Sequence, residues 1–470
     1  MKTRIEHDLL GNKEVPMDAY YGVQTLRAIE NFAGISGYTI GMFPNYVKAL
    51  AMVKWAAAKA NQELGILPDD IADAITRACE EIISGKLHDQ FPVDLIQGGA
   101  GTSTNMNINE VVANRALEIL GHEKGEYQYC HPNNHVNMSQ STNDAYPTAF
   151  KLAFIFMNEE LVADLKLLIQ AFRAKGEEFK EIIKMGRTQL QDAVPMTVGQ
   201  EFEAFAANLE EEVDRLNQNA KLFLEVNMGA TAIGTGINSE PEYSAKCIKN
   251  LRIISGEEFV LASNLIEATP DAGSAVMYSS ALKRMAVKLS KICSDLRLLS
   301  SGPRCGLSEI NLPPMQPGSS IMPGKVNPVI PEVVNQICFR VIGNDLTVTF
   351  AAEAGQLQLN VMEPVLVDSI FSSIKMLQKG MDRLRTLCVE GITVNVDRCR
   401  TMVLNSIGIV TALNPTLGYE NSSRIAKRAL KENRSVYDLV LEEGLLTKEE
   451  LDELLKPENM IKPHKFYIKK

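Results

Sequence analysis

The sequence predicts an all-α protein built around a central bundle of long helices. Long segments contain neither glycine nor proline, and apolar residues recur in them every three or four positions, as on one face of a helix. The longest of these segments predict helices of about 27 residues, or about 40 Å, well above the average of about 11–12 residues. In residues 1–140, no succession of strands alternates with helices, so a parallel sheet is not expected there.

The N-terminal segment, residues 1–140, predicts a mainly helical domain with short helices. Helical patterns occur near Pro44–Leu64, Pro68–Ser84 and Asn105–Leu120, and loops rich in glycine, proline and asparagine separate them. The most polar of these loops is Gly98–Asn105. We expect these elements to form one unit that precedes the bundle.

The central segment, residues 141–396, predicts the long-helix bundle domain. The helical segments expected here are 148–175, 200–228, 274–301, 329–354 and 365–390. In the third of these, the apolar residues from Leu282 to Leu299 step by three and four, which is the spacing of a coiled-coil seam. Helices of this length that follow one another indicate a bundle.

The C-terminal segment, residues 397–470, predicts a small helical domain. Thr447 and Glu450 have the spacing of a capping box, which begins a helix that we expect to run through Leu455. This segment carries no side-chain pattern that indicates chemistry.

Several of the long helices are apolar on more than one face. In the first long helix, four apolar residues are spread too widely around the helix to form a single stripe: Leu165, Leu167, Leu168 and Ile169. Such a helix must be covered on all sides. We therefore expect a homo-oligomer whose core is formed by these bundles, and a large monomeric core is the alternative.

The composition indicates which binding partners to exclude and which cellular compartment to expect. The formal charge of −10 argues against nucleic acid and against an anionic membrane surface, since both require a basic face. The eight cysteines show no close pairs, as expected for reduced thiols. The N-terminus is too polar for a signal peptide, and no stretch approaches the roughly 18 apolar residues of a membrane span. We expect a soluble cytoplasmic protein.

The loop Gly318–Pro328 is the first candidate for a functional site. It contains two adjacent serines, Ser319 and Ser320, together with Lys325 and Asn327, and its glycines and prolines prevent a continuous helix. Hydroxyl groups, backbone N–H groups and one cation suit a small anion, especially a carboxylate. The alternative is an ordinary connector between helices with capping serines.

Three further polar stretches are expected at the ends of helices: Gly101–Asn105, Ser139–Asp144 and Gly186–Asp192. Each alone is typical of an N-cap. Together they supply neutral donors and acceptors that suit a small dicarboxylate with an ammonium group.

His131 and His135 stand four apart, but a proline interrupts them, which favours a loop over a metal site. No metal or nucleotide motif is present, so we expect neither metal nor cofactor.

In this order, the four stretches resemble the active-site regions of the fumarase/aspartase superfamily. The resemblance runs from Asp18–Gly22 to Asn414–Pro415, and the segments Val326–Gln336 and Gln358–Val365 are most similar to those of aspartases. Gln189 stands where fumarases carry histidine, which weighs against fumarate hydratase, the alternative function. Some aspartases carry histidine there as well, so this position discriminates in one direction only.

The resemblance implies a three-domain helical fold, a tetramer core of bundled helices and active sites shared between three subunits. It also implies removal of ammonia from L-aspartate to give fumarate, with Ser319 as the general base. By the same resemblance, the substrate ligands are Ser320, Ser141 and Thr142 for the β-carboxylate, Thr188, Lys325 and Asn327 for the α-carboxylate, and Thr102, Asn143 and Gln189 for the amine. A catalytically silent oligomer is the alternative of another class, and it would be expected to lack the loop serines or the lysine that are present here.

Overall fold

The structure is a computed structural model that describes residues 2–461 and 463. The chain divides into two units. Unit 1 consists of Met1–Ala163, Val213–Ala286 and Phe339–Gln378, and unit 2 of Asp164–Glu212, Val287–Cys338 and Lys379–Lys470. The division into residues 1–140, 141–396 and 397–470 that the sequence suggests stays a prediction.

The short helices of unit 1 are α1 (Val23–Phe32), α2 (Pro44–Glu63), α3 (Asp69–Ile83), α4 (Thr102–Ile119), α7 (Tyr243–Ser255) and α8 (Leu265–Ala268). Three of them, α2, α3 and α4, lie close to where the sequence predicts them, and α1, α7 and α8 were not predicted. Helix α4 begins three residues earlier than expected. The reason is a tight turn at Gly99, Ala100 and Gly101, all with positive φ, which directs the chain into the helix at Thr102.

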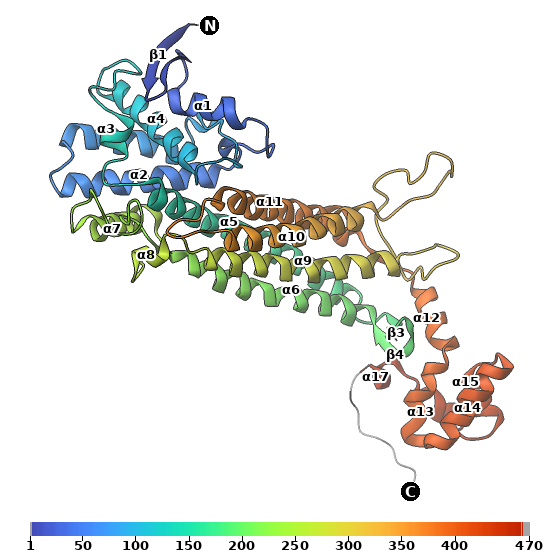
Figure 1. Cartoon of the computed structure of the whole chain (residues 1–470). Helices are drawn as coiled ribbons and strands as arrows, with labels where there is room; N and C mark the ends of the chain where they lie inside the picture. Colours follow the sequence, from blue (N-terminus) through green and yellow to red (C-terminus); the bar gives the residue numbers. More distant parts are fainter. Residues whose placement is uncertain (1, 462, 464–470) are drawn as a thin grey trace. The chain divides into compact units, whose positions relative to one another are not determined.

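Five long helices confirm the predicted all-α class and its long central helices (Figure 1). They are α5 (Thr142–Glu178), α6 (Val198–Ala220), α9 (Gly273–Leu299), α10 (Val329–Glu353) and α11 (Glu363–Leu387). Each contributes one part to unit 1 and the other part to unit 2. None of the helices within the described residues combines the length and apolar character that a membrane crossing requires.

Helix α5 contains a proline, Pro147, which the sequence analysis placed before the helix. Proline has no N–H group, so the carbonyl four residues earlier, that of Asn143, loses its helical partner. The side chain of Asn227 donates to this carbonyl at 3.0 Å instead. The helix therefore begins at Thr142 rather than after the proline.

Aromatic side chains join the long helices within each unit. In unit 1, Phe154 of α5 packs against Phe371 of α11, with ring centroids 5.2 Å apart. In unit 2, Phe172 of α5 packs against Phe202 and Phe205 of α6, the latter with centroids 5.7 Å apart. Rings of this size account for much of the apolar area that the helices bury.

The expectation of one helix over 200–228 was wrong at its C-terminal end. Helix α6 ends at Ala220, and β5 (Glu225–Val226) then pairs in parallel with β6 (Val260–Leu261). No proline or glycine marks this change. Pairing with a distant segment therefore overrides the local preference for a helix.

The remaining strands of the described residues also form two-stranded sheets. They are β1 (Thr3–Asp8) with β2 (Gly11–Pro16), β3 (Ile183–Thr188) with β4 (Gln191–Thr197), and β7 (Ile310–Asn311) with β8 (Thr393–Val394), all antiparallel. The sequence analysis did not predict these strands, because strands this short carry little periodicity.

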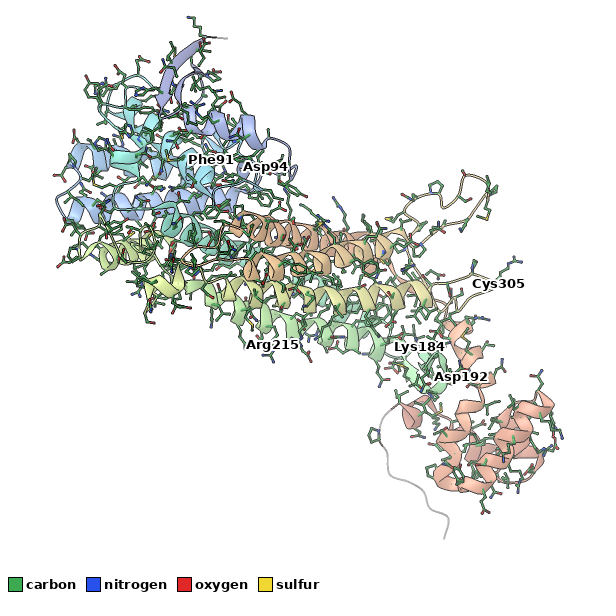
Figure 2. All side chains as sticks on the ribbon, viewed as in Figure 1. Phe91, Asp94, Lys184, Asp192, Arg215 and Cys305 are labelled. Carbon is green, nitrogen blue, oxygen red and sulfur yellow. The ribbon has the colours of Figure 1, made fainter. Side chains whose placement is uncertain are left out.

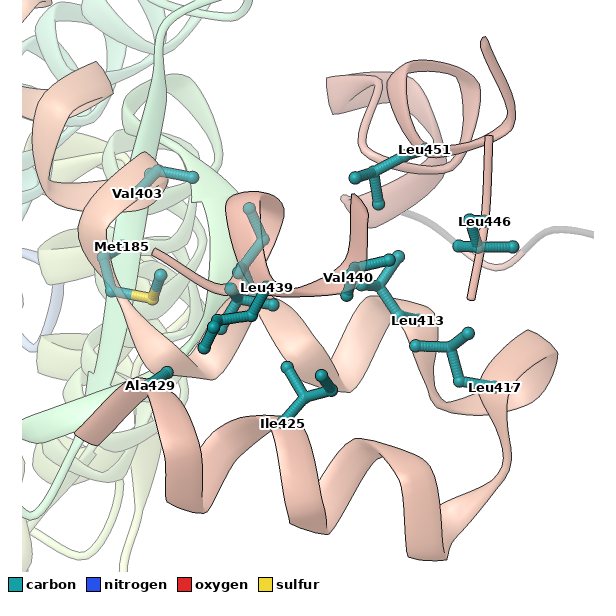
Figure 3. Packing of buried hydrophobic residues seen from close by; sticks show 12 residues of the cluster. Met185, Val403, Leu413, Leu417, Ile425, Ala429, Leu439, Val440, Leu446 and Leu451 are labelled. Carbon is teal, nitrogen blue, oxygen red and sulfur yellow. The ribbon is translucent and has the colours of Figure 1, made fainter. Parts of the chain in front are cut away.

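The C-terminal part of unit 2 is helical, as predicted. Its helices are α12 (Val396–Asn405), α13 (Val410–Leu417), α14 (Tyr419–Glu432), α15 (Val436–Glu442), α16 (Lys448–Leu454) and α17 (Pro457–Met460). The capping box of Thr447 and Glu450 is confirmed at the start of α16. These helices share an apolar core with Met185 of β3 (Figure 3), which ties the β3–β4 hairpin to them.

Candidate active site

The residues predicted to act on the substrate occur in both units. Unit 1 holds Thr102, Ser141, Thr142 and Asn143, and unit 2 holds Thr188, Gln189, Ser319, Ser320, Lys325 and Asn327. Each unit arranges its own group.

In unit 1, the structure brings two of the predicted stretches together. The side chain of Asn105 on α4 donates to Thr142 Oγ1 at the start of α5, at 3.2 Å. Ser141 caps this helix start, because its Oγ accepts the N–H of Asn143 at 3.2 Å. The N–H of Ser141 in turn donates to Asp144 at 2.9 Å. Hydroxyl and amide groups from two helix N-termini therefore lie in one place, where the helix dipoles also favour an anion.

Thr102 lies at the start of α4 and is exposed. Its hydroxyl donates to the carbonyl of Gly99 at 2.8 Å. Gly101, just before it, lies against the ring of Tyr146 on α5, and a Cβ there would be 2.6 Å from the ring. Glycine at this position lets the α4 start approach α5 closely.

The buried Lys54 on α2 is a group that the sequence analysis missed. Its side chain is 1% exposed, and Nζ donates to Asn105 Oδ1 at 2.6 Å and to Gln140 Oε1 at 2.8 Å. Burial lowers the pKa of Lys54 to about 7, although the nearby Asp144 opposes this shift. The amine of Lys54 therefore lies directly behind the amide that contacts Thr142. Lys54 is one of three lysines in α2 and gave no clear signal, because lysines are almost always exposed.

A second missed element is the loop 227–236 of unit 1. The N–H groups of Gly229 and Thr231 donate to Asp144 Oδ2, at 3.0 and 2.9 Å. The side chain of Asn143 donates to a carbonyl of the same loop at 2.7 Å. Burial raises the pKa of Asp144 to about 6, against the lowering effect of these N–H bonds. The mixture of Gly, Thr and Asn in this loop was the available signal.

In unit 2, the predicted general base has two backbone donors. Ser319 is half-buried, and its Oγ accepts the N–H of Ile321 at 3.2 Å and the N–H of Met322 at 3.0 Å. Donors aimed at one oxygen stabilise negative charge on it. The N–H groups of Ile321 and Met322 are therefore placed to stabilise negative charge on Ser319 Oγ.

The same loop closes on itself through Gly318. The N–H of Gly318 donates to the carbonyl of Lys325 at 2.7 Å, and the side chain of Asn327 donates to the carbonyl of Gly318 at 2.9 Å. The loop and the preceding residues 314–317 line an open pocket of about 540 Å³. Ser319, Met322 and Lys325 are among the residues that line it. Ser320 and Lys325 are exposed.

The expected position of the stretch Gly186–Asp192 at the end of a helix was wrong. The sequence analysis expected it at the end of a helix, but it forms the tip of the β3–β4 hairpin. Thr188 is the last residue of β3, and Gln189 and Leu190 turn the chain with φ of 54° and 62°. A two-residue turn with both φ positive usually contains glycine or asparagine, so the hairpin had no sequence signal. Thr188 and Gln189 are both exposed.

The histidine pair is held locally. The N–H of Asn133 donates to His131 Nδ1 at 3.0 Å, and the N–H of His131 donates to His135 Nδ1 at 2.8 Å. Burial lowers the pKa of both imidazoles. No group of three or more His, Cys, Asp or Glu side chains suited to a metal ion occurs within residues 2–461 and 463. The absence of a metal from the function stays a prediction.

Comparison with known proteins defines the class. Residues 11–343 match the family described as Lyase, and residues 409–462 match the family described as Fumarase C C-terminus. The chain therefore belongs to the lyase family of the fumarase/aspartase superfamily, which confirms the resemblance seen in the sequence.

Individual relatives are similar over nearly the whole chain. The aspartate ammonia-lyase of Pseudomonas aeruginosa is 63% identical, over 98% of this chain and 97% of that protein. The crystal structure of fumarate lyase:delta crystallin from Brucella melitensis bound to cobalt has a TM-score of 0.95 at 56% identity and covers 98% of this chain and 100% of that one. The class II fumarase from Schistosoma mansoni has a TM-score of 0.91 at 35% identity, over 99% and 100% of the two chains.

Proposed function

We propose that this chain catalyses the reversible removal of ammonia from L-aspartate to give fumarate, and so acts as a carbon–nitrogen lyase. The observation that carries this proposal is the 63% identity to an aspartate ammonia-lyase over 98% of the chain. The polar groups of both units supply the donors and acceptors that a dicarboxylate with an ammonium group requires.

The difficult step is removal of the C3 proton. It produces a doubly charged aci-carboxylate, so stabilising that charge is the largest catalytic requirement. Ser319 is the proposed general base. The N–H groups of Ile321 and Met322 that donate to its Oγ stabilise its anionic form, and this lowers the cost of ionising a weak acid.

The other proposed site residues bind three chemical groups of the substrate. The β-carboxylate is bound by Ser320, Ser141 and Thr142, the α-carboxylate by Thr188, Lys325 and Asn327, and the amine by Thr102, Asn143 and Gln189. Once the aci-carboxylate has formed, the electron pair returns to make the C2–C3 double bond, and ammonia leaves from C2. The reaction is redox-neutral, and we propose that no cofactor takes part.

We further propose a homotetramer in which three subunits contribute to each active site. Support comes from α10, where Phe339, Leu346 and Phe350 are 61%, 56% and 64% exposed. Their spacing of seven and four places them on one face of the helix. An exposed apolar stripe of this kind is typical of a surface that another chain covers.

We place the enzyme in the cytoplasm. All eight cysteines are free thiols, and seven of them are buried. This pattern is typical of a reducing compartment.

Two incubations test the function. With fumarate and ammonia, we expect L-aspartate as the product, and with aspartate alone we expect fumarate. Incubation with fumarate in the absence of ammonia separates the rival activity, because a fumarate hydratase would form malate. Malate formation without aspartate formation would contradict the proposal.

A further inference from the structure

One buried carboxylate, that of Glu309, supports the polar tip of the β3–β4 hairpin in unit 2. Its side chain is 1% exposed. Oε1 lies 2.7 Å from Arg187 Nη1, and Oε2 lies 2.9 Å from Lys184 Nζ. Lys184 is 2% exposed and also contacts Glu201 at 2.5 Å. Two cations and two carboxylates thus balance one another where unpaired charges would be very costly.

The geometry of β3 explains how two of its side chains reach the same carboxylate. Met185 joins the apolar core of the C-terminal helices. Because side chains alternate along a strand, Lys184 is on the opposite face of β3. Figure 2 labels Lys184 at the β3–β4 hairpin. Strict alternation would place Arg187 on the side of Met185. A bulge between Met185 and Arg187 shifts the register and brings Arg187 to Glu309.

Glycine at position 186 makes this bulge possible. A Cβ on Gly186 would lie 2.8 Å from the carbonyl of Val194 on the paired strand. Such a contact is too short for any other residue without a backbone shift. The local sequence is therefore adapted to aim Arg187 at Glu309 and not at solvent.

The backbone of Glu309 is itself anchored. Its N–H donates to the carbonyl of Leu299 at 2.9 Å, and its carbonyl accepts the N–H of Asn395 at 2.8 Å. The carboxylate thus extends from a fixed backbone to Arg187. Thr188 is the next residue along the chain, so the pair restricts the position of the Thr188 hydroxyl.

We propose that Glu309 is a positioning residue for the ammonia-lyase reaction, which holds Thr188 through Arg187 so that it binds the α-carboxylate of the substrate. This inference rests on the proposed function of Thr188. Glu309 does not touch the substrate in this role. Loss of Glu309 therefore weakens the binding of a dicarboxylate more than it lowers the rate at which bound substrate reacts.

Glu309→Gln tests this role, because it removes the charge and keeps the shape. We expect the KM for aspartate to rise about 10- to 100-fold, which is the size of effect that the loss of one hydrogen bond to a charged group produces. The Kd of succinate, which keeps both carboxylates and cannot react, rises by a similar factor. Arg187→Gln raises both values comparably, and the double variant adds little, because the two residues act as one unit.

Glu212→Gln is the matched control. Glu212 on α6 is 0% exposed and lies 2.6 Å from Lys288 of α9, so it is another buried ion-paired carboxylate of unit 2. We expect this variant to lose thermal stability and to keep the wild-type KM and succinate Kd. A purely structural role for Glu309 would make the two variants alike.

The outcomes separate the inference from the proposed function. If Glu309→Gln keeps the KM and succinate Kd of Glu212→Gln, the inference is overturned. If Glu309→Gln does not fold, Glu309→Asp takes its place, because it keeps the charge but shortens the reach to Arg187; a wild-type KM and Kd in that variant also overturn the inference. If the wild-type enzyme binds succinate but converts no aspartate, the proposed function fails, and the Kd comparison still tests the role of Glu309.

Discussion

At the residue scale, the proposed role of Ser319 as general base requires a loop that stabilises the anion of its hydroxyl. A free hydroxyl ionises far above physiological pH, so it acts as a base only where its anion is stabilised. The sequence analysis assigned this task to Lys325 and to unspecified backbone donors. The structure identifies two such donors, the N–H groups of Ile321 and Met322.

Ser319→Ala removes the proposed base. We expect kcat to fall by at least about 10²- to 10⁴-fold, the usual contribution of a positioned base. Stability should change little, because Ser319 lies in an exposed loop. Fumarate formation and thermal unfolding measure the two effects. Activity near that of the wild type would contradict the assignment of Ser319.

Lys54 offers a pH-dependent test at the same scale. Its pKa is lowered to about 7 in the folded protein, from an ordinary value of 10.5. Between these pH values the unfolded chain holds a proton that the folded protein has lost. Raising the pH through this window therefore favours the folded state, and the contribution levels off below about pH 7.

Lys54→Met isolates this contribution. The free energy of unfolding of the wild type, minus that of the variant, should rise with pH by about 1.4 kcal/mol per unit between about pH 7.5 and 9.5. Urea unfolding at fixed protein concentration measures both proteins, since assembly also affects stability. A difference that stays constant over this range would show that Lys54 titrates as an exposed lysine does.

At the element scale, the loop Gly318–Pro328 depends on close backbone contacts. Gly318 donates to the carbonyl of Lys325 and leaves no space for a side chain. This closure sets the path of the loop between its two ends, and with it the position of Ser319. The loop is mostly exposed, so few packing contacts would restore its shape after a change.

Gly318→Ala disturbs this closure. A Cβ would lie 2.6 Å from the carbonyl of Lys325, so the backbone segments at Gly318 and at Lys325 must move apart. We expect kcat/KM to fall about 10-fold or more, because a displacement of about 1 Å at a reacting group costs up to about 100-fold. The thermal midpoint should stay close to that of the wild type. A large loss of stability with normal activity would mean that Gly318 supports the fold and not the site.

At the scale of the whole molecule, the apolar stripe of α10 carries the proposal of assembly. Phe339, Leu346 and Phe350 are large apolar residues that face solvent in the single chain. Covering them with another subunit removes this area from water and so favours association. If three subunits share each site, assembly and activity must be lost together.

Phe350→Glu tests this coupling, because it places a charge at one end of the stripe. We expect the variant to sediment as smaller species and to lose nearly all activity. Leu430→Glu is the control, since Leu430 is 73% exposed on α14, outside the stripe. It should keep both assembly and activity. A Phe350→Glu variant that sediments as the wild type would contradict the interface.

The sequence by itself determined the features that depend on neighbouring residues. The expected helix 274–301 matches α9 (Gly273–Leu299), and the capping box at Thr447 begins α16 as predicted. Periodicity and caps are local, so a sequence displays them directly. The four polar stretches were also visible, because their motifs are continuous in the chain.

Only the tertiary structure decided which groups lie behind those stretches. Lys54 reaches Asn105, and Glu309 reaches Arg187, across long separations in the chain. Each residue type has an ordinary exposed role, so its sequence neighbours do not indicate burial. The turn at Gln189 also depends on the folded chain, because pairing of β3 with β4 imposes a backbone conformation that the local residues do not favour. Buried charge and strained turns exist only where distant contacts compensate them, and those contacts appear only in the folded chain.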